Sequence, residues 1–227
     1  MQQAPQPQLD GLDNLADAQD RWTGHVTLVT GASSGIGAAI CRELVKQGMT
    51  VVGCARNDER IKEMAAELQG CAGSLTAMRC DLSQLDQVDA MFRTIEQQFG
   101  GEDVLINNAD LNFGRWLLDG SAEKWRAMLD VNVLALAHCA QLAVNNMAAC
   151  EVSEAQVINI CSRAGHCVDD WPDLHFCTAT KYAVTALTES LRQEVAAKKM
   201  RIRVAQISPG LVNTDIANRM LADKQEA

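Results

Sequence analysis

The chain has 227 residues and a mass of 24.6 kDa, which is enough for one domain with a sizeable core and too little for two. Hydrophobic residues make up 48% of it, so a globular chain is expected rather than a disordered one. The net charge of −9 and the pI near 4.9 argue against a surface that binds nucleic acid or an anionic membrane, but they leave room for a local basic pocket that holds a phosphate.

The first twenty residues contain four aspartates and neither lysine nor arginine. They lack the basic start and the apolar run of a signal peptide, and they are not arginine-rich like a mitochondrial presequence. We therefore predict a flexible tail over residues 1–20, a single domain over residues 21–227 and a cytoplasmic protein. No run of eighteen apolar residues occurs, so no membrane span is expected.

Short apolar runs that predict β-strands then alternate with patterns that predict helices. The expected strands cover residues 25–31, 50–55, 75–81, 103–109, 155–162 and 201–210. The expected helices cover residues 36–48, 59–70, 85–100, 134–149 and 181–198. This alternation predicts a doubly wound α/β domain, with a parallel sheet and helices on both faces. Since little chain follows Gly210, six strands are expected, and one sheet edge stays unpaired unless another chain or the N-terminal tail covers it.

Nine cysteines are spread along these elements, in an odd number and without a C-x-x-C pair. Most of them fall inside apolar runs such as "VVGCAR" and "VINICS", which predicts buried free thiols in a reducing compartment. The four histidines show no metal-ligand spacing, so no metal site is expected.

The segment "TGASSGIG" (30–37) directly follows the first expected strand and opens a helix. Gly31 permits the tight turn, Gly35 lets the backbone approach a phosphate, and Gly37 lets the helix pack on the strand. Free N–H groups at the helix start then face an anion. The spacing differs from G-x-G-x-x-G, and an ordinary glycine-rich turn is the alternative, but the strand–turn–helix context favours a phosphate site.

Arg56 bears on the choice of dinucleotide. An acidic residue at the end of the second strand would accept a hydrogen bond from a ribose 2′-hydroxyl and repel a 2′-phosphate. This chain has Arg56 at that position, whose planar fork suits a phosphate. We therefore predict NADP(H) rather than NAD(H); a solvated surface arginine is the alternative.

Together with the glycine segment, several further segments resemble the short-chain dehydrogenase/reductase family, in the right order over about residues 21–220. They are "NNAD" (107–110), "DVNV" (130–133), "INICSRAGH" (158–166), "CTATK" (177–181) and "SPGLVNTDIA" (208–217). The stretches "GMTVVGCAR" and "ATKYAVTALTESLRQE" look like the branch that contains insect farnesol dehydrogenases. The resemblance implies a Rossmann-like fold that lacks the family's last strand. Because that strand and the helix before it often build the family's dimer, a homo-oligomer is doubtful here.

The resemblance also implies a set of site residues. The cofactor site would comprise Gly31, Ser33, Ser34, Gly35, Ile36, Gly37, Arg56, Asp81, Leu82, Asn108, Ala109, Lys181, Pro209, Gly210 and Thr214, with Asp81 near the adenine. The four catalytic positions are Asn132, Ser162, Cys177 and Lys181. In the family a tyrosine at position 177 gives a proton to the carbonyl while the nicotinamide gives a hydride. The lysine lowers the pKa of the phenol and holds the ribose, the serine orients the substrate oxygen, and the asparagine supports a proton relay through water.

Cys177 departs from the family's tyrosine. Its side chain is a ring shorter, so the sulfur should not reach the substrate oxygen that Ser162 holds, and the nearby ammonium of Lys181 favours a thiolate, which has no proton to give. Tyr182 lies about 140° further round a helix and is expected to be a packing residue. A water molecule in the gap could relay a proton, and loss of a positioned acid typically costs ~10²–10⁴ in rate.

Asp110 is the second departure, because the family has a glycine there. An aspartate adds bulk and a negative charge near a polyanionic ligand. It either turns outward harmlessly or weakens binding by ~1–2 kcal/mol through strain or repulsion.

Residues 167–176 are expected to line a substrate pocket, which Trp171 and Phe176 would make apolar. Three hypotheses follow. The first is an NADP(H)-dependent oxidoreductase for a lipophilic alcohol or carbonyl compound, weakened by Cys177. The second is a non-catalytic NADP(H)-binding relative that acts as a sensor or partner subunit. The third is a thiol-based role for Cys177, activated by Lys181.

Overall fold

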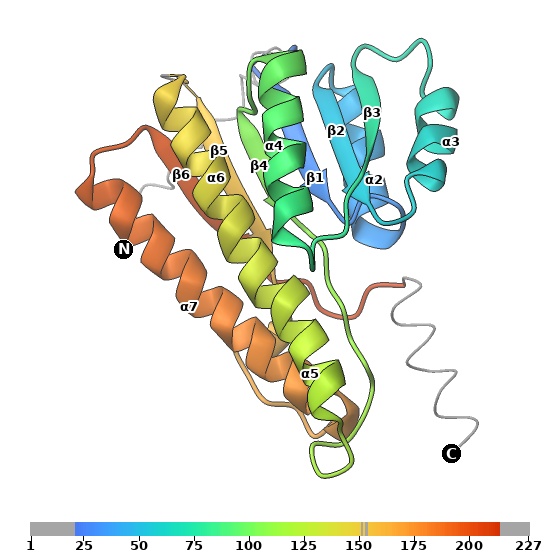
Figure 1. Cartoon of the computed structure of the whole chain (residues 1–227), viewed down its shortest axis with the longest axis vertical. Helices are drawn as coiled ribbons and strands as arrows, with labels where there is room; N and C mark the ends of the chain where they lie inside the picture. The colour runs from blue at the N-terminus through green and yellow to red at the C-terminus, as the bar shows by residue number, and fades with distance from the viewer. Residues whose placement is uncertain (1–20, 151, 153, 214–227) are drawn as a thin grey trace, which may run out of the picture.

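The computed structural model describes residues 21–150, 152 and 154–213. Its centre is a six-stranded parallel sheet with the strand order β3-β2-β1-β4-β5-β6 (Figure 1). The strands are β1 (Val26–Thr30), β2 (Thr50–Ala55), β3 (Ser74–Arg79), β4 (Val104–Asn107), β5 (Ala155–Ile160) and β6 (Ile202–Ile207). The predicted doubly wound α/β fold and its six strands are confirmed. The tail predicted over residues 1–20 lies outside the described residues.

Helices cover both faces of the sheet. The helices α2 (Gly35–Lys46) and α3 (Glu59–Glu67) lie on one face, and α4 (Leu85–Phe99), α6 (Leu136–Ala149) and α7 (His175–Ala197) lie on the other (Figure 1). Neighbouring residues of β1 point to opposite faces, so Leu28 packs with α4 and α6 while Val29 packs with α2 and α3. This explains why the strands read as continuous apolar runs.

The helical segment before β5 is longer than predicted. It begins at Ala122 and runs through α5 (Ala122–Leu129) and a π-helical turn η1 (Asp130–Ala135) into α6. The Ser121 hydroxyl caps its start by accepting a hydrogen bond from the Lys124 N–H at 3.3 Å. The wide turn at Asp130–Ala135 shifts the helical periodicity, which is why the apolar pattern indicated only the later part.

The stretch Ala122–Ala149 is also long and apolar enough, by length and composition, to cross a membrane. A core helix of a soluble protein meets the same test, and here Ala140, Ala143 and Met147 are buried against the sheet. Packing in the core therefore accounts for part of this apolar composition, while Leu129 and Leu134 of the same segment are exposed.

The helix α7 begins at His175 and not at Lys181 as predicted, because the short helix η3 (Pro172–Leu174) leads into it. A buried polar chain fixes it to the sheet. Asn107 Nδ2 donates to Asn159 Oδ1 at 3.0 Å, and Asn159 Nδ2 donates to Thr188 Oγ1 at 2.9 Å. These bonds set how the residues at the start of α7 approach the ends of β4 and β5.

Two further features concern the surface and the thiols. Among the described residues, β6 pairs only with β5, and Arg21 forms an ion pair with Glu154 beside these two strands. All nine cysteines are free, and six are buried, namely Cys41, Cys54, Cys80, Cys139, Cys161 and Cys177. Within the described ranges, no group of three or more histidine, cysteine or acidic side chains is placed to hold a metal ion.

Candidate functional site

The predicted site residues follow the carboxyl ends of the six strands. In the order of the sheet, Asp81 comes after β3, Arg56 after β2, Gly31 after β1, Asn108 after β4, Ser162 after β5 and Pro209 after β6. The strand order reverses between β1 and β4, which is where ligands bind in open α/β sheets. The fold therefore brings residues from the whole chain to one edge of the sheet.

Two glycines allow the turn after β1 to pack against the loop after β4. Gly31 has a φ of +67°, and a Cβ there would lie 2.8 Å from Ala109 Cα. A Cβ on Gly37 would overlap both Asn108 Nδ2 and the Gly31 carbonyl oxygen. The glycine pattern is thus required by close approach of two loops, in addition to any ligand.

Thr30 ties the same two loops together and was missed by the sequence analysis. Its hydroxyl oxygen accepts from the backbone N–H groups of Asn108 and Ala109, at 3.0 and 3.1 Å. The Asn108 side chain in turn donates to the carbonyl oxygens of Thr30 and Gly31. The signal was present as a hydroxyl residue directly before Gly31. Asn108 and Ala109, predicted to bind the cofactor, thus also hold the turn that would receive it.

The start of α2 offers donors to an anion. Ser34 is the residue before the helix and makes no side-chain capping bond, and the first turn holds no acidic residue. Ser33, Gly35 and Ile36 complete the turn. The first N–H groups of a helix without a cap remain available to a ligand oxygen.

Arg56 and Asp81 flank this turn on the neighbouring strands. Arg56 is exposed just beyond β2, where its guanidinium is accessible to a phosphate. Asp81 Oδ1 accepts from the Ser83 N–H and hydroxyl, at 3.0 and 2.8 Å, and Leu82 is buried. Uncapped helix donors beside an accessible arginine fit the phosphate groups of a dinucleotide.

Ser162 lies at the end of β5, before the short helix η2 (Arg163–Gly165). Its Oγ accepts from the Ala164 N–H at 3.1 Å, and the N–H of Arg163 donates to the Pro209 carbonyl oxygen at 2.9 Å. Because the Ser162 hydroxyl acts as an acceptor in this bond, its own proton is available for a substrate oxygen. Gly210 is exposed in the loop after β6, and Thr214 lies outside the described residues.

Asn132 is buried in η1, and its side chain is committed to the protein. The amide accepts from the Leu111 N–H at 2.8 Å and donates to the Leu111 carbonyl oxygen at 2.9 Å. It also donates to Thr180 Oγ1 at 3.2 Å. Asn132 therefore fastens the loop that carries Asp110 to the first turns of α7.

Cys177 and Lys181 lie one turn apart on α7, and both are buried, with exposed fractions of 6% and 5%. Burial, and secondarily the negative charge of Asp110, raises the pKa of the Cys177 thiol to about 12, although Lys181 opposes the shift. The expectation of a thiolate is wrong, because desolvation outweighs the neighbouring ammonium. Cys177 keeps its proton at neutral pH, and a thiol-based role activated by Lys181 has no basis in this geometry.

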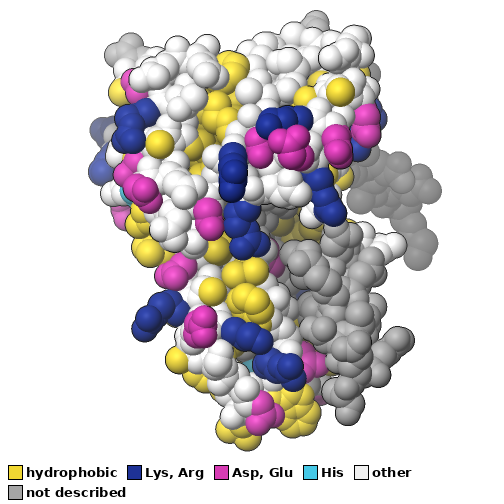
Figure 2. Space-filling model, turned by 45° about the vertical axis from the view of Figure 1, so that its right-hand side comes forward, with side chains coloured by type: hydrophobic (Ala, Val, Ile, Leu, Met, Phe, Trp, Pro, Cys, Tyr) yellow, Lys and Arg dark blue, Asp and Glu magenta, His cyan; other side chains and the backbone are white. Residues whose placement is uncertain are grey.

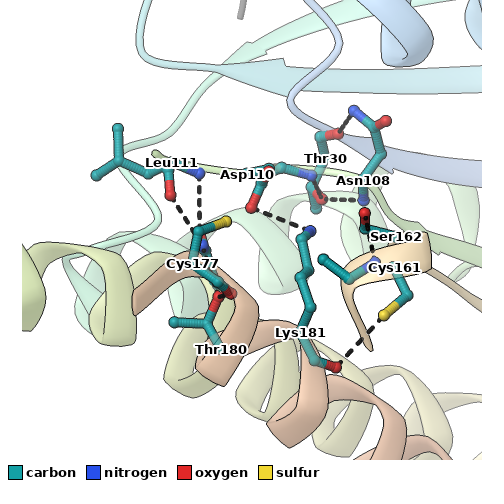
Figure 3. A network of polar contacts seen from close by, with 12 residues as sticks. Thr30, Asn108, Asp110, Leu111, Cys161, Ser162, Cys177, Thr180 and Lys181 are labelled. Carbon is teal, nitrogen blue, oxygen red and sulfur yellow. Dashed lines mark hydrogen bonds and ion pairs between the residues drawn. The ribbon is translucent and has the colours of Figure 1, made fainter. Parts of the chain in front are cut away.

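Asp110 turns inward and forms an ion pair with Lys181 (Figure 3), with 3.0 Å between Oδ1 and Nζ. Burial is the largest influence and by itself would lower the pKa of Lys181, but the charge and the hydrogen bond of Asp110, together with contributions from Cys177 and Cys161, hold that pKa above its ordinary value. Among the described residues other than glycine, only Lys199 has a positive φ, so the backbone at Asp110 is not strained. The expected outward turn is therefore wrong and the backbone shows no strain, while weaker cofactor binding through repulsion stays a prediction.

The remaining residues of interest lie around this centre. Phe176 stacks on Trp125 of α5, with ring centroids 5.0 Å apart, and Trp171 is partly exposed. Tyr182 is 43% exposed, so it faces away from the core and the prediction that it is a packing residue is wrong. His166 is exposed and contacts Ser208 Oγ at 2.8 Å, as a loop residue.

The site combines a glycine turn, where the strand order reverses, with Ser162 after β5 and Lys181 in α7. This combination defines a dinucleotide-dependent oxidoreductase site. Residues 25–225 match the model of the short chain dehydrogenase family, and the chain belongs to that family. It is 49% identical over 203 residues to the chicken (Gallus gallus) protein named dehydrogenase/reductase SDR family member 11, covering 88% of this chain and 80% of that protein. It is 43% identical over 199 residues to farnesol dehydrogenase of Aedes aegypti, covering 87% and 81%. The resemblance to this branch is thereby confirmed.

Solved structures agree on the fold. A short chain dehydrogenase/reductase from Burkholderia phymatum in complex with NAD superposes with a TM-score of 0.80 and 28% identity, covering 87% of this chain and 69% of that one. A variant of the actinorhodin polyketide ketoreductase with NADPH also has a TM-score of 0.80 and 28% identity, covering 91% and 77%. Since one neighbour holds NAD and the other NADPH, the family supports a nicotinamide cofactor without deciding between the two.

Proposed function

We propose that this protein binds NADP(H) and acts in the cytoplasm as a slow oxidoreductase on a lipophilic alcohol or carbonyl compound. The observation that carries the proposal is the glycine turn at the end of β1, which opens an uncapped helix beside the accessible Arg56. Arg56 supports the phosphorylated dinucleotide, because its guanidinium can bind the 2′-phosphate of NADP(H). It has no acceptor atom for the ribose 2′-hydroxyl of NAD(H), which an acidic residue would bind. The free thiols support a reducing compartment.

Apolar side chains in the loop after Asp110 support a lipophilic substrate. Trp116, Leu117 and Leu118 are exposed by 54%, 49% and 93%. Hydrophobic side chains gather at the end of the molecule where this loop lies (Figure 2). A relative named farnesol dehydrogenase is consistent with a long apolar alcohol, and the exposed loop gives such a chain a surface to contact.

The residues of the chain can perform part of the reaction. When bound, the reduced cofactor supplies a hydride to a carbonyl carbon. Ser162 has a hydroxyl proton available to orient the carbonyl oxygen, and Asn132 fixes the loop beside it. Cys177 is too short to reach that oxygen and, with its pKa raised by burial, is a poor acid, so the proton for the product hydroxyl comes from solvent.

A non-catalytic role in binding NADP(H), as a sensor or partner subunit, is the second candidate. The ion pair between Asp110 and Lys181 favours it, because it occupies the lysine that the site would offer to a ligand. This candidate predicts the same binding and no turnover.

The test compares the native chain with Cys177→Tyr for NADPH oxidation on a panel of lipophilic aldehydes and ketones, with NADPH binding followed by fluorescence. Cys150→Tyr is the matched control, since Cys150 is exposed just after α6 and remote from the site. We expect NADPH to bind all three, Cys177→Tyr to turn over ~10²–10⁴ faster than the native chain, and the control to behave like the native chain. Failure of the native chain to bind NADPH would refute the proposal, and binding without detectable turnover would favour the sensor.

A further inference from the structure

In the ion pair between Asp110 and Lys181 the lysine is enclosed by the protein, while the Asp110 side chain is 21% exposed. Lys181 is 5% exposed, and its Nζ lies 3.0 Å from Asp110 Oδ1. In Figure 3 the lysine rises from α7 directly toward the aspartate, with Cys177 one turn before it on the same side. The site thus has a buried cation whose counter-charge comes from the chain itself.

The aspartate is held in place from both sides along the chain. Its predecessor, Ala109, donates its N–H to Thr30 Oγ1 at 3.1 Å. Its successor, Leu111, is bound through both its N–H and its carbonyl oxygen by Asn132. Because both neighbours are fixed, the backbone of Asp110 is held where its carboxylate can reach Lys181.

A buried lysine that loses its partner leaves an uncompensated charge in a low-dielectric environment, which is strongly unfavourable. A ligand oxygen that seeks a hydrogen bond from Lys181 must therefore share the ammonium with Asp110 or separate the pair. At the other end of the site, the uncapped start of α2 and Arg56 carry no such internal partner among the described residues. The two ends of the site differ in what they can still give to a ligand.

We propose that Asp110 captures Lys181, so that the chain holds NADP(H) mainly by its adenosine and phosphate half and binds the nicotinamide half only weakly. This inference rests on the proposed function and makes Asp110 a determinant of how the ligand is held. In this proposal Asp110 weakens cofactor binding by competing with the cofactor for the Lys181 ammonium, and not by repelling the cofactor's negative charge.

The test uses two ligands, NADPH and 2′,5′-ADP, which carries the 2′-phosphate and the 5′-phosphate but no nicotinamide. Calorimetric titration of the native chain should give affinities within about threefold of each other. In Asp110→Asn the affinity for NADPH should rise at least ~10-fold, while that for 2′,5′-ADP should change less than about twofold. Glu67→Gln, which breaks the surface pair with Arg42, is the matched control and should change neither affinity.

The variant Asp110→Asn/Lys181→Met separates capture from repulsion. Capture predicts that it gains nothing for NADPH, because no lysine is released, whereas a gain equal to that of Asp110→Asn would overturn the inference. So would a native chain that already binds NADPH more than about 30-fold better than 2′,5′-ADP, with the same ratio in Asp110→Asn. Thermal unfolding checks that each variant is folded, and failure of both ligands to bind the native chain would refute the proposed function and this inference with it.

Discussion

The two ends of the site differ in whether their polar groups already have partners within the protein. At the ends of β1 and β2, the turn around Gly31 and Gly37 keeps its tight packing, and the start of α2 and Arg56 stay accessible. Near the ends of β4 and β5, Asn132 of η1 is bound to Leu111 and Lys181 of α7 is bound to Asp110 (Figure 3). The groups at the nucleotide end thus stay available to a ligand, whereas Asn132 and Lys181 at the catalytic end already have partners within the protein.

The largest effect concerns the thiol at the catalytic end. Because burial raises the pKa of Cys177 from 9.0 to about 12, its thiolate fraction at neutral pH falls about 10³-fold. Iodoacetamide at pH 7.5 should therefore alkylate Cys177 at least ~10³ more slowly than the exposed Cys150, as followed by peptide mass spectrometry. Rapid labelling of Cys177, suppressed by NADPH, would restore the thiol hypothesis and contradict the burial.

A substitution at the nucleotide end should abolish binding. In Gly37→Val the new side chain would overlap Asn108 and the Gly31 carbonyl, so the turn after β1 must move. We expect the affinities for NADPH and 2′,5′-ADP to fall together by at least ~100-fold. Gly114→Ala is the control, because its Cβ would meet only Asp173 at an ordinary 3.8 Å and binding should be unchanged. Normal binding by Gly37→Val would show that this turn is not the nucleotide site.

Arg56 should decide which dinucleotide that end prefers. Arg56→Ala should weaken NADPH binding by about 10-fold or more and leave NADH binding unchanged, because a charge-assisted hydrogen bond to the 2′-phosphate is lost. Fluorescence titration with both dinucleotides measures this, with Arg93→Ala on the exposed side of α4 as the control. Equal affinities in the native chain and the variant would assign Arg56 to the solvated surface.

The smallest predicted effect is a change in stability with pH, and it arises at the amino ends of the strands, away from both ends of the site. Glu102 is 1% exposed, and neither of its carboxylate oxygens has a hydrogen-bond partner of good geometry among the described residues. Burial, with minor contributions from Asp103 and Glu96, raises its pKa from 4.5 to about 8. The folded chain therefore holds this proton more tightly than the unfolded chain, and stability falls as the pH rises from 4.5 to about 8.

Glu102→Gln should remove that loss. In urea unfolding, the free energy of unfolding of the native chain should fall by about 1 kcal/mol or more between pH 6 and pH 8, and that of the variant should fall less. NADPH affinity should be the same in both chains, since Glu102 precedes β4 at its amino end. Stability of the native chain that rises with pH in this window would contradict the assignment.

Features that depend on local pattern were predictable from the sequence. The six strands, their parallel pairing and the glycine turn followed from apolar periodicity and from glycine spacing. The pairing of Cys177 and Lys181 on one helical face followed from their spacing of four. These are statements about neighbours along the chain.

Features that depend on burial and on distant contacts were not predictable. The partner of Lys181 is Asp110, which lies on the loop after β4 while Lys181 lies in α7, and no spacing rule connects them. The spacing of Lys181 and Cys177 predicted an ammonium beside the thiol and therefore a thiolate. Burial of Cys177, which raises its pKa and keeps it protonated, arises only when α7 packs on the rest of the protein. Thr30 was overlooked because its role is to accept from Asn108 and Ala109 across two strands.

The most direct test of the contrast is the rate of NADPH oxidation at saturating NADPH, with a lipophilic aldehyde as acceptor, in the native chain and in Asp110→Gly/Cys177→Tyr. Equal occupancy removes the nucleotide end from the comparison and leaves only the catalytic end. We predict that the double variant turns over at least ~10² faster than the native chain. Equal rates in the two chains would contradict the account, because they would show that neither Cys177 nor Asp110 limits the chemistry.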